Sequence, residues 1–299
     1  GARVAGRRGV ADDRVMLPGD NHVHTQWSWD ADAGSMEASC ARAAELGLPS
    51  IAFTDHVDLT RWVLMPLGQG VLHRDPGSAG PDDRFDAPPL DLDGYLECLR
   101  RCRDRFPGLR ILSGIEFGEP HWHAEALKAL LDSGAWQRVL GSLHSLELAD
   151  GPWLVDELYQ EHAPADLDPD AVMRSYLGEA LRLVESSDAF EVLAHVDYPV
   201  RRRPAGAARF EPARFEEELR AVLAALARSG RALEVNTMVP LRPEIVGWWR
   251  EAGGEAVSFG SDAHAPEVVA RGFAEAAAMV EAHGFSPGRH PHDFWWRRA

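Results

Sequence analysis

The stretch Asp20-Asn21-His22-Val23-His24-Thr25 carries two histidines that are separated by a single residue. Side chains alternate between the two faces of an extended strand, so His22 and His24 point to the same side and can bind one metal ion together. The stretch follows the apolar run Val15-Met16-Leu17 and precedes a polar loop that contains Asp30. It therefore predicts a first strand that carries His22 and His24 at its carboxyl end.

The composition is that of a globular protein that can bury a large core. The chain has 299 residues, of which 45% are hydrophobic and 26% are charged. No apolar run approaches the length of a membrane span, and the first residues lack the apolar region of a secretory signal. Residues 1–15 are predicted to be a flexible leader, and residues 16–299 to form a single domain.

The charges and the cysteines indicate which partners the protein can bind and in which cellular compartment it functions. The 31 basic and 47 acidic residues give a formal net charge of −16. A strongly negative protein repels polyanions, which makes nucleic acid an unfavourable partner, whereas local arginines can still bind a small phosphorylated metabolite. The cysteines number three, without the spacing of a metal site, and such sparse use fits a reducing cytoplasm.

Short apolar runs alternate with amphipathic stretches along the chain, a pattern typical of repeated strand-and-helix units. After the first strand, strands are predicted at 50–54, 110–116, 138–143, 191–194, 232–236 and 256–260. Helices are predicted at 35–46, 91–106, 124–131, 170–186, 212–229, 243–251 and 267–283. Two long irregular segments, 57–89 and 147–169, are expected to shape a substrate pocket. The alternation predicts an α/β fold, a parallel (β/α)7 barrel in a single domain.

Chemically active side chains end nearly every predicted strand, which is where parallel barrels place their functional residues. Beyond the first strand they are Thr54-Asp55-His56, Glu116, His144, His195 with Asp197, and Asp262 with His264. Burying so many imidazoles and carboxylates without partners is costly, and divalent cations remove that cost. The set therefore predicts a metal centre.

Taken in order, these residues resemble the polymerase and histidinol phosphatase (PHP) superfamily. The phrase Leu193-Ala194-His195-Val196-Asp197 is most similar to its histidinol-phosphate phosphatase branch, and the resemblance runs from residue 20 to residue 264. It implies a distorted seven-stranded barrel that holds three divalent ions; zinc, manganese and iron all suit mixed histidine and carboxylate ligands. The implied ligand sets are His22, His24, Glu116 and Asp262; Glu116, His144 and His195; and Asp30, His56 and His264.

The resemblance further implies a cytoplasmic phosphatase that hydrolyses a small phosphate monoester, with histidinol phosphate as the substrate it names. Adjacent cations lower the pKa of a bridging water, so that hydroxide held beside Glu116 can attack phosphorus. Asp55 is expected to orient a ligand rather than to bind an ion.

Other side chains are candidates for binding the phosphate or moving a proton. One guanidinium group can donate two parallel hydrogen bonds to phosphate oxygens. Arg174 and the run Arg201-Arg202-Arg203 are therefore candidate donors. In that run, Arg201 and Arg202 lie nearest the fifth predicted strand. Asp197 shares a strand face with His195 and is a candidate for protonating the leaving oxygen or orienting a ligand.

Three other functions are compatible with parts of the pattern. A PHP-type exonuclease or phosphodiesterase would use similar ligands, but the net negative charge disfavours it. An amidohydrolase also begins with two alternating histidines, yet it commonly needs a carbamylated lysine, and the single lysine, Lys128, lies on a predicted helix. A non-catalytic metal-binding regulatory module would be expected to lack ligands, and none of those implied by the resemblance is missing.

Overall fold

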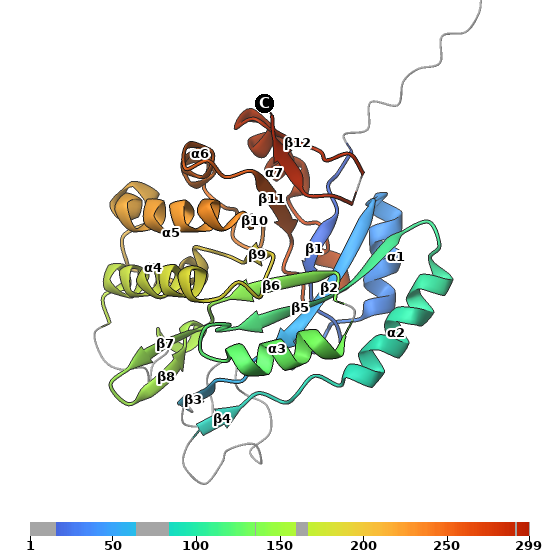
Figure 1. Ribbon diagram of the computed structural model, residues 1–299, viewed down its shortest axis with the longest axis horizontal. Coiled ribbons are helices and arrows are strands. Elements are labelled where there is room, and N and C mark those ends of the chain that lie inside the picture. Colours follow the sequence, from blue (N-terminus) through green and yellow to red (C-terminus); the bar gives the residue numbers. More distant parts are fainter. Residues whose placement is uncertain (1–15, 64–83, 135, 160–166, 291, 299) are drawn as a thin grey trace, which may run out of the picture.

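A curled sheet of nine strands forms the centre of the molecule (Figure 1). The computed structural model describes residues 16–63, 84–134, 136–159, 167–290 and 292–298, so the predicted leader lies outside it. Seven of the strands are parallel and follow one another in space in chain order. They are β1 (Asp20–Val23), β2 (Ser50–Val57), β5 (Arg110–Gly118), β6 (Arg138–Ser142), β9 (Val192–Leu193), β10 (Ala232–Asn236) and β11 (Ala256–Gly260).

The first and last parallel strands meet and close the distorted barrel. The backbone N–H of Asp262, just beyond β11, donates to the His22 carbonyl at 2.8 Å, and the N–H of His24 donates to the Ala263 carbonyl at 2.9 Å. The buried Asp20 carboxylate of β1 accepts hydrogen bonds from the backbone and the hydroxyl of Ser261 at 3.0 and 2.6 Å. The predicted α/β fold with a single seven-stranded parallel barrel is confirmed.

Helices cover the outer face of the sheet (Figure 1). They are α1 (Met36–Leu46), α2 (Leu92–Arg105), α3 (Ala124–Ser133), α4 (Pro169–Ser186), α5 (Glu216–Ser229), α6 (Pro243–Glu251) and α7 (Phe273–Ala282). The Ser35 side chain caps α1, and Gly47 ends it in the left-handed conformation at φ 72°. None of the helices in the described ranges combines the length and the apolar character needed to span a membrane.

The core lies between the sheet and the helices. Strands β2 and β5 are buried on both faces, with Phe53 and Phe117 fully inaccessible, so their apolar residues are not confined to alternate positions. Tyr95 of α2 reaches between these strands, because its hydroxyl donates to the Phe53 carbonyl at 2.9 Å and accepts from the Gly114 N–H at 2.9 Å. This contact fixes α2 to the strand that carries Glu116.

The segments expected to be irregular contain hairpins where the structure describes them. The first holds β3 (Arg61–Val63) and β4 (Arg84–Asp86), and the second holds β7 (Ser145–Leu148), β8 (Gly151–Leu154) and the short helix η1 (Val155–Glu157). The two hairpins lie side by side below the sheet in Figure 1. Trp62, Phe85 and Leu154 form a small apolar cluster between them, and the Trp62 indole N–H donates to the Ser145 hydroxyl at 2.7 Å.

The carboxyl-terminal part differs most from the predicted elements. The predicted helix 267–283 is two elements, η4 (Pro266–Val268) and α7, because Ala270 and Gly272 take positive φ values of 54° and 73°. The tail then returns as β12 (Phe285–Ser286) and β13 (Trp295–Arg297), which pair antiparallel with each other and, through β13, with β11. Trp295 is buried against Phe259 at 4.9 Å between ring centres, so packing holds this short strand in place.

Candidate metal centre

All nine predicted metal ligands gather at the carboxyl end of the barrel. Seven of them are buried, whereas Asp30 and His264 are partly exposed. They come from six of the seven parallel strands or from the residues that follow them: His22, His24 and Asp30 with β1, His56 with β2, Glu116 with β5, His144 with β6, His195 with β9, and Asp262 and His264 with β11. The parallel arrangement brings the strand ends together and thereby collects residues that are far apart in the sequence.

Glu116 lies between two groups of histidines. Its Oε2 atom is 3.0 Å from Nε2 of His22 and 3.2 Å from Nε2 of His24. Its Oε1 atom is 3.1 Å from Nε2 of His144 and 2.7 Å from Nε2 of His195. Burial raises the pKa of the Glu116 carboxyl, but the surrounding imidazole charges outweigh it and hold the pKa well below its usual range. The two oxygens of one carboxylate thus face separate ligand groups, as a bridging ligand requires.

The other carboxylates complete these groups. Oδ1 of Asp262 is 3.2 Å from Nε2 of His24 and 3.6 Å from Nε2 of His22. These ring nitrogens and an Asp262 oxygen lie close enough together to hold one ion. The same is true of Glu116 with His144 and His195.

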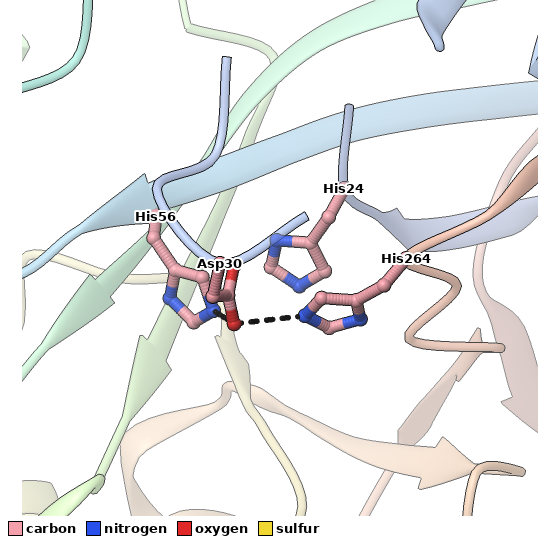
Figure 2. A group of neighbouring side chains, drawn as sticks. All are labelled: His24, Asp30, His56 and His264. Atoms are coloured by element: carbon pink, nitrogen blue, oxygen red, sulfur yellow. Dashed lines mark hydrogen bonds and ion pairs between the residues drawn. The ribbon is translucent and has the colours of Figure 1, made fainter. Parts of the chain in front are cut away.

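Asp30 anchors a further group, shown in Figure 2. Its Oδ2 atom lies 3.0 Å from Nε2 of His264 and 3.3 Å from Nε2 of His56. The ring of His24 stacks between them, with ring centres 4.4 Å from His56 and 4.2 Å from His264. His24 therefore lies within reach of two ligand groups.

A surrounding layer of hydrogen bonds orients the imidazoles. Oε1 of Glu234 lies 2.6 Å from Nδ1 of His22, and Oδ1 of Asp58 lies 2.9 Å from Nδ1 of His144. The Ser28 hydroxyl lies 2.9 Å from Nδ1 of His24. Such outer partners fix the ring orientation and leave Nε2 for an ion.

Glu234, Asp58 and Ser28 had not been predicted as members of this layer. Glu234 lies inside the strand 232–236 and also accepts from the His195 backbone N–H at 2.7 Å. The available signal was an acid flanked by apolar residues in Leu233-Glu234-Val235. Asp55 was expected to orient a ligand, and its carboxylate accepts from the Thr25 N–H and hydroxyl at 2.6 and 2.8 Å, next to His24.

The donor set suits divalent transition metals. It consists of imidazole nitrogens and carboxylate oxygens without thiolate, which is compatible with zinc, manganese or iron. Within the described residues, the buried Oδ1 atom of Asp30 and the buried Nδ1 atom of His195 have no hydrogen-bond partner. Unpaired polar atoms beside several buried carboxylates are unfavourable unless cations compensate them, so the residues fit the ions that the resemblance implies.

Seven of the nine ligands line a cavity of about 390 Å³. Its wall is completed by Tyr198, Arg201 and Arg202 of the short helix η2 (Tyr198–Arg202), by Asp156 of η1, and by Met238 and Val239. The cavity thus joins the ligand cluster to two guanidinium groups.

The two arginines in the wall differ in their surroundings. Arg201 is nearly buried, forms an ion pair with Asp262 and lies over the Tyr198 ring at 4.5 Å. Burial lowers the pKa of Arg201, but the charge of Asp262 outweighs this and raises it above its usual range, so Arg201 stays cationic. Arg202 is about half exposed, and its Nε lies 3.2 Å from Oδ2 of Asp156.

Three candidates from the sequence do not line the cavity. Arg174 on α4 is half exposed, pairs with Glu218 of α5 and donates to the Arg214 carbonyl at 2.8 Å, so the structure does not bring it to the site. Arg203 pairs with Asp170 instead. Asp197 is buried and is not among the residues that line the cavity, and burial raises its pKa to about 6. Its role in proton transfer stays a prediction.

Comparison with known proteins agrees with this geometry. Residues 20–238, more than two thirds of the chain, match the model of the PHP domain. The chain belongs to the PHP-domain family. This PHP protein is similar to the histidinol-phosphatase of Lactococcus lactis, at 24% identity over 89% of the chain and 91% of the relative. It is also similar to a probable histidinol-phosphatase of Deinococcus radiodurans, at 27% identity over 87% of the chain and 92% of the relative.

Solved structures share the fold of this PHP protein. A crystal structure of histidinol phosphate phosphatase from Lactococcus lactis, complexed with zinc, L-histidinol and phosphate, has a TM-score of 0.74 at 22% identity. The match covers 94% of this chain and 99% of that one. A putative histidinol phosphatase from Listeria monocytogenes has a TM-score of 0.68 at 18% identity, covering 86% and 99%. The predicted family and the distorted barrel are confirmed.

Proposed function

We propose that this PHP protein is a metal-dependent phosphatase that hydrolyses a small phosphate monoester of the histidinol phosphate type. The observation that carries the proposal is the convergence of the predicted ligand groups, two of which meet at Glu116, on a cavity whose wall also presents Arg201 and Arg202. The names of the relatives support the substrate class, as does the L-histidinol and phosphate bound in one solved structure.

The ligand groups define which residues would hold ions. One group is His22, His24 and Asp262 with an oxygen of Glu116; the second is Glu116, His144 and His195; the third is Asp30, His56 and His264 with His24 beside them. Divalent ions in such a site neutralise charge on phosphoryl oxygens and make water a stronger nucleophile.

The arginines would bind the phosphoryl group. Arg201 keeps its positive charge in a nearly buried position, where a charge-assisted hydrogen bond is strong. Its ion pair with Asp262 points the guanidinium toward the ligand cluster, so the same side chain can contact an oxygen of a bound phosphate. Arg202, half exposed at the wall, would contact the substrate farther from the cluster.

The shape of the site favours a small substrate over a polymer. A cavity of about 390 Å³ accommodates a metabolite, and residues of η1 and η2 form part of its wall. The net charge of −16 also opposes approach of a nucleic acid. We place the protein in the cytoplasm, because its three cysteines are buried and unpaired.

The test is a substrate panel on protein reconstituted separately with manganese, zinc and iron. L-Histidinol phosphate and p-nitrophenyl phosphate should release phosphate, whereas single-stranded DNA should not be degraded. His22→Ala and Glu116→Ala should lose bound metal and turnover together, while Lys128→Ala, on the exposed face of α3, should retain both. Degradation of DNA without phosphatase activity would favour the exonuclease alternative, and unchanged turnover in Glu116→Ala would remove the catalytic proposal.

A further inference from the structure

Glu119, the residue that follows β5, is a buried acid that does not line the cavity. Its Oε1 atom accepts hydrogen bonds from two consecutive backbone N–H groups, that of His144 at 2.7 Å and that of Ser145 at 2.9 Å. Its Oε2 atom accepts from the Thr60 hydroxyl at 2.7 Å. Both carboxylate oxygens are thus bonded, and one of them holds the backbone that carries the predicted ligand His144.

The backbone of Glu119 is in an unfavourable conformation. Its φ is 48°, in the left-handed region that residues with a side chain rarely adopt. In the described part of the chain, four residues other than glycine have a positive φ, and two of them are the predicted ligands His195 and Asp262. Such conformations cost free energy and persist where surrounding contacts hold them, often at functional sites. The conformation of Glu119 therefore points to a role in the same centre.

The carboxylate of Glu119 holds the backbone of His144 just beyond the point where strand pairing ends. Gly118 and Ser142 are the last paired residues of β5 and β6, and the Glu119 N–H donates to the Ser142 carbonyl at 2.9 Å. The N–H of His144 donates to Glu119, and its carbonyl accepts from the N–H of Val155 at 2.7 Å. Because the imidazole is joined to the backbone only through the χ1 and χ2 bonds, the position of the backbone determines where Nε2 can lie.

We propose that Glu119 is a positioning residue of the metal centre. Its hydrogen bonds to the two N–H groups place the backbone of His144, and thereby set the geometry in which Glu116, His144 and His195 hold an ion. Thr60, which precedes β3, holds the other oxygen of Glu119 in turn. The inference depends on this predicted ligand group but not on the proposed substrate, because it is measured as bound metal rather than as turnover.

The competing explanation is that Glu119 only stabilises the connection between β5 and the chain after β6. The two explanations differ in what they predict for bound ions. A contact that is only structural would lower the free energy of unfolding of the metal-free protein and leave the affinity for every ion unchanged. A positioning contact would weaken the ion held by Glu116, His144 and His195 and leave the other ions as tightly bound as before.

The experiment measures bound zinc per chain at a series of buffered free zinc concentrations. Glu119→Ala removes the acceptor and should raise the Kd of one ion about 10- to 100-fold, the size expected when an outer partner of a metal ligand is lost. In Glu119→Gln the amide oxygen can still accept from both N–H groups, so each Kd should stay within about threefold of the wild-type value. Thr60→Val removes only the hydroxyl that holds Oε2 and should raise the same Kd by a smaller factor than Glu119→Ala.

Glu179→Ala is the matched control. Glu179 is another buried carboxylate that contacts the chain just after Glu119, at His121 and Trp122, and no predicted ligand is among its hydrogen-bond partners. The control should bind zinc as the wild type does. Urea denaturation of every variant in the presence of chelator measures the stability of the metal-free protein separately, so a loss of folding is not mistaken for a loss of affinity.

The outcomes separate this inference from the proposed function. Unchanged zinc binding in Glu119→Ala, an equal loss in Glu119→Gln, or an equal loss in the Glu179→Ala control would overturn the role of Glu119. If Glu119→Ala does not fold, Thr60→Val decides, and wild-type affinity for every ion in that variant would overturn the inference. A wild type that binds zinc but hydrolyses no ester would contradict the proposed function alone, whereas a wild type that binds no ion would overturn both.

Discussion

Oδ1 of Asp58 lies 2.9 Å from Nδ1 of His144. Burial alone lowers the pKa of His144, but Asp58 and then Glu116 outweigh it and raise the pKa to about 10. The other Asp58 oxygen accepts from the indole N–H of Trp29 at 2.9 Å and lies 3.2 Å from Nδ1 of His56. One carboxylate thus contacts two predicted ligands, and Trp29 connects it to the small apolar cluster between the hairpins.

Replacing Asp58 should weaken the metal centre while leaving the nine predicted ligands in place. Asp58→Asn is expected to lower metal affinity about 10- to 100-fold, because outer partners fix ring orientation and ligand basicity. Competition with a chromophoric chelator measures this affinity. Asp86→Asn, an exposed change on β4, is the matched control. Identical chelator curves for the two variants would show that Asp58 has no such role.

Removing the ions should destabilise the fold. Ions that bind only the folded chain raise the free energy of unfolding, by about 4 kcal/mol at a thousandfold excess over Kd. Without the ions, burial of the clustered carboxylates and imidazoles is not compensated and lowers the free energy of unfolding. Calorimetry should therefore show a lower Tm after chelation of the wild type and a smaller shift for Glu116→Gln. A Tm that is insensitive to chelator would contradict the presence of resident ions.

The contact of Tyr95 with β2 and β5 should contribute to stability but not to the site. Tyr95→Phe leaves the Phe53 carbonyl and the Gly114 N–H without their partner, which is expected to lower the free energy of unfolding by about 1–3 kcal/mol. Urea denaturation measures the change, and metal content should stay the same. Leu96→Ala, a change at a more exposed position on the same helix, should cost much less.

A second contact predicts a pH dependence of stability. Glu179 of α4 accepts from the indole N–H of Trp122 at 3.0 Å and lies 2.7 Å from Nε2 of His121. His121, against the effect of burial and together with Arg182, lowers the Glu179 pKa from 4.5 to about 2. A carboxyl with a lowered pKa contributes stability above pH 4.5, and that contribution is lost as the pH falls from 4.5 toward 2.

Glu179→Gln should therefore be less stable than the wild type at neutral pH, by about 1–3 kcal/mol, and the difference should shrink below pH 4.5. Urea denaturation at about pH 7 and about pH 3.5 measures both values. Glu185→Gln, an exposed change on the same helix, should show no such trend. A difference that is constant with pH would mean that the ionised form of Glu179 is not what stabilises the fold.

The elements that followed clear local signals were predicted well. The strands 232–236 and 256–260 and the helix 243–251 have the predicted bounds, because apolar runs, a proline at the helix start and glycines define them locally. The split near Gly272 and the pairing of Trp295 with β11 were missed. They depend on contacts with distant segments, which no local pattern encodes.

The sequence by itself predicted the barrel and placed most of the nine clustered side chains at strand ends, because local patterns mark those ends and parallel strands bring them together. The full ligand set, including Asp30 in the loop after the first strand, was implied by the resemblance to the PHP superfamily. Only the tertiary structure decided which atoms face one another and which outer acids orient them. The tertiary structure also showed which arginines line the cavity. Neighbouring side chains of a tight 3-10 turn point in different directions. Arg201 and Arg202 therefore reach the cavity, whereas Arg203 pairs with Asp170. The direction of each arginine side chain does not follow from its position in the sequence. It is set by the packing of η2 against the barrel.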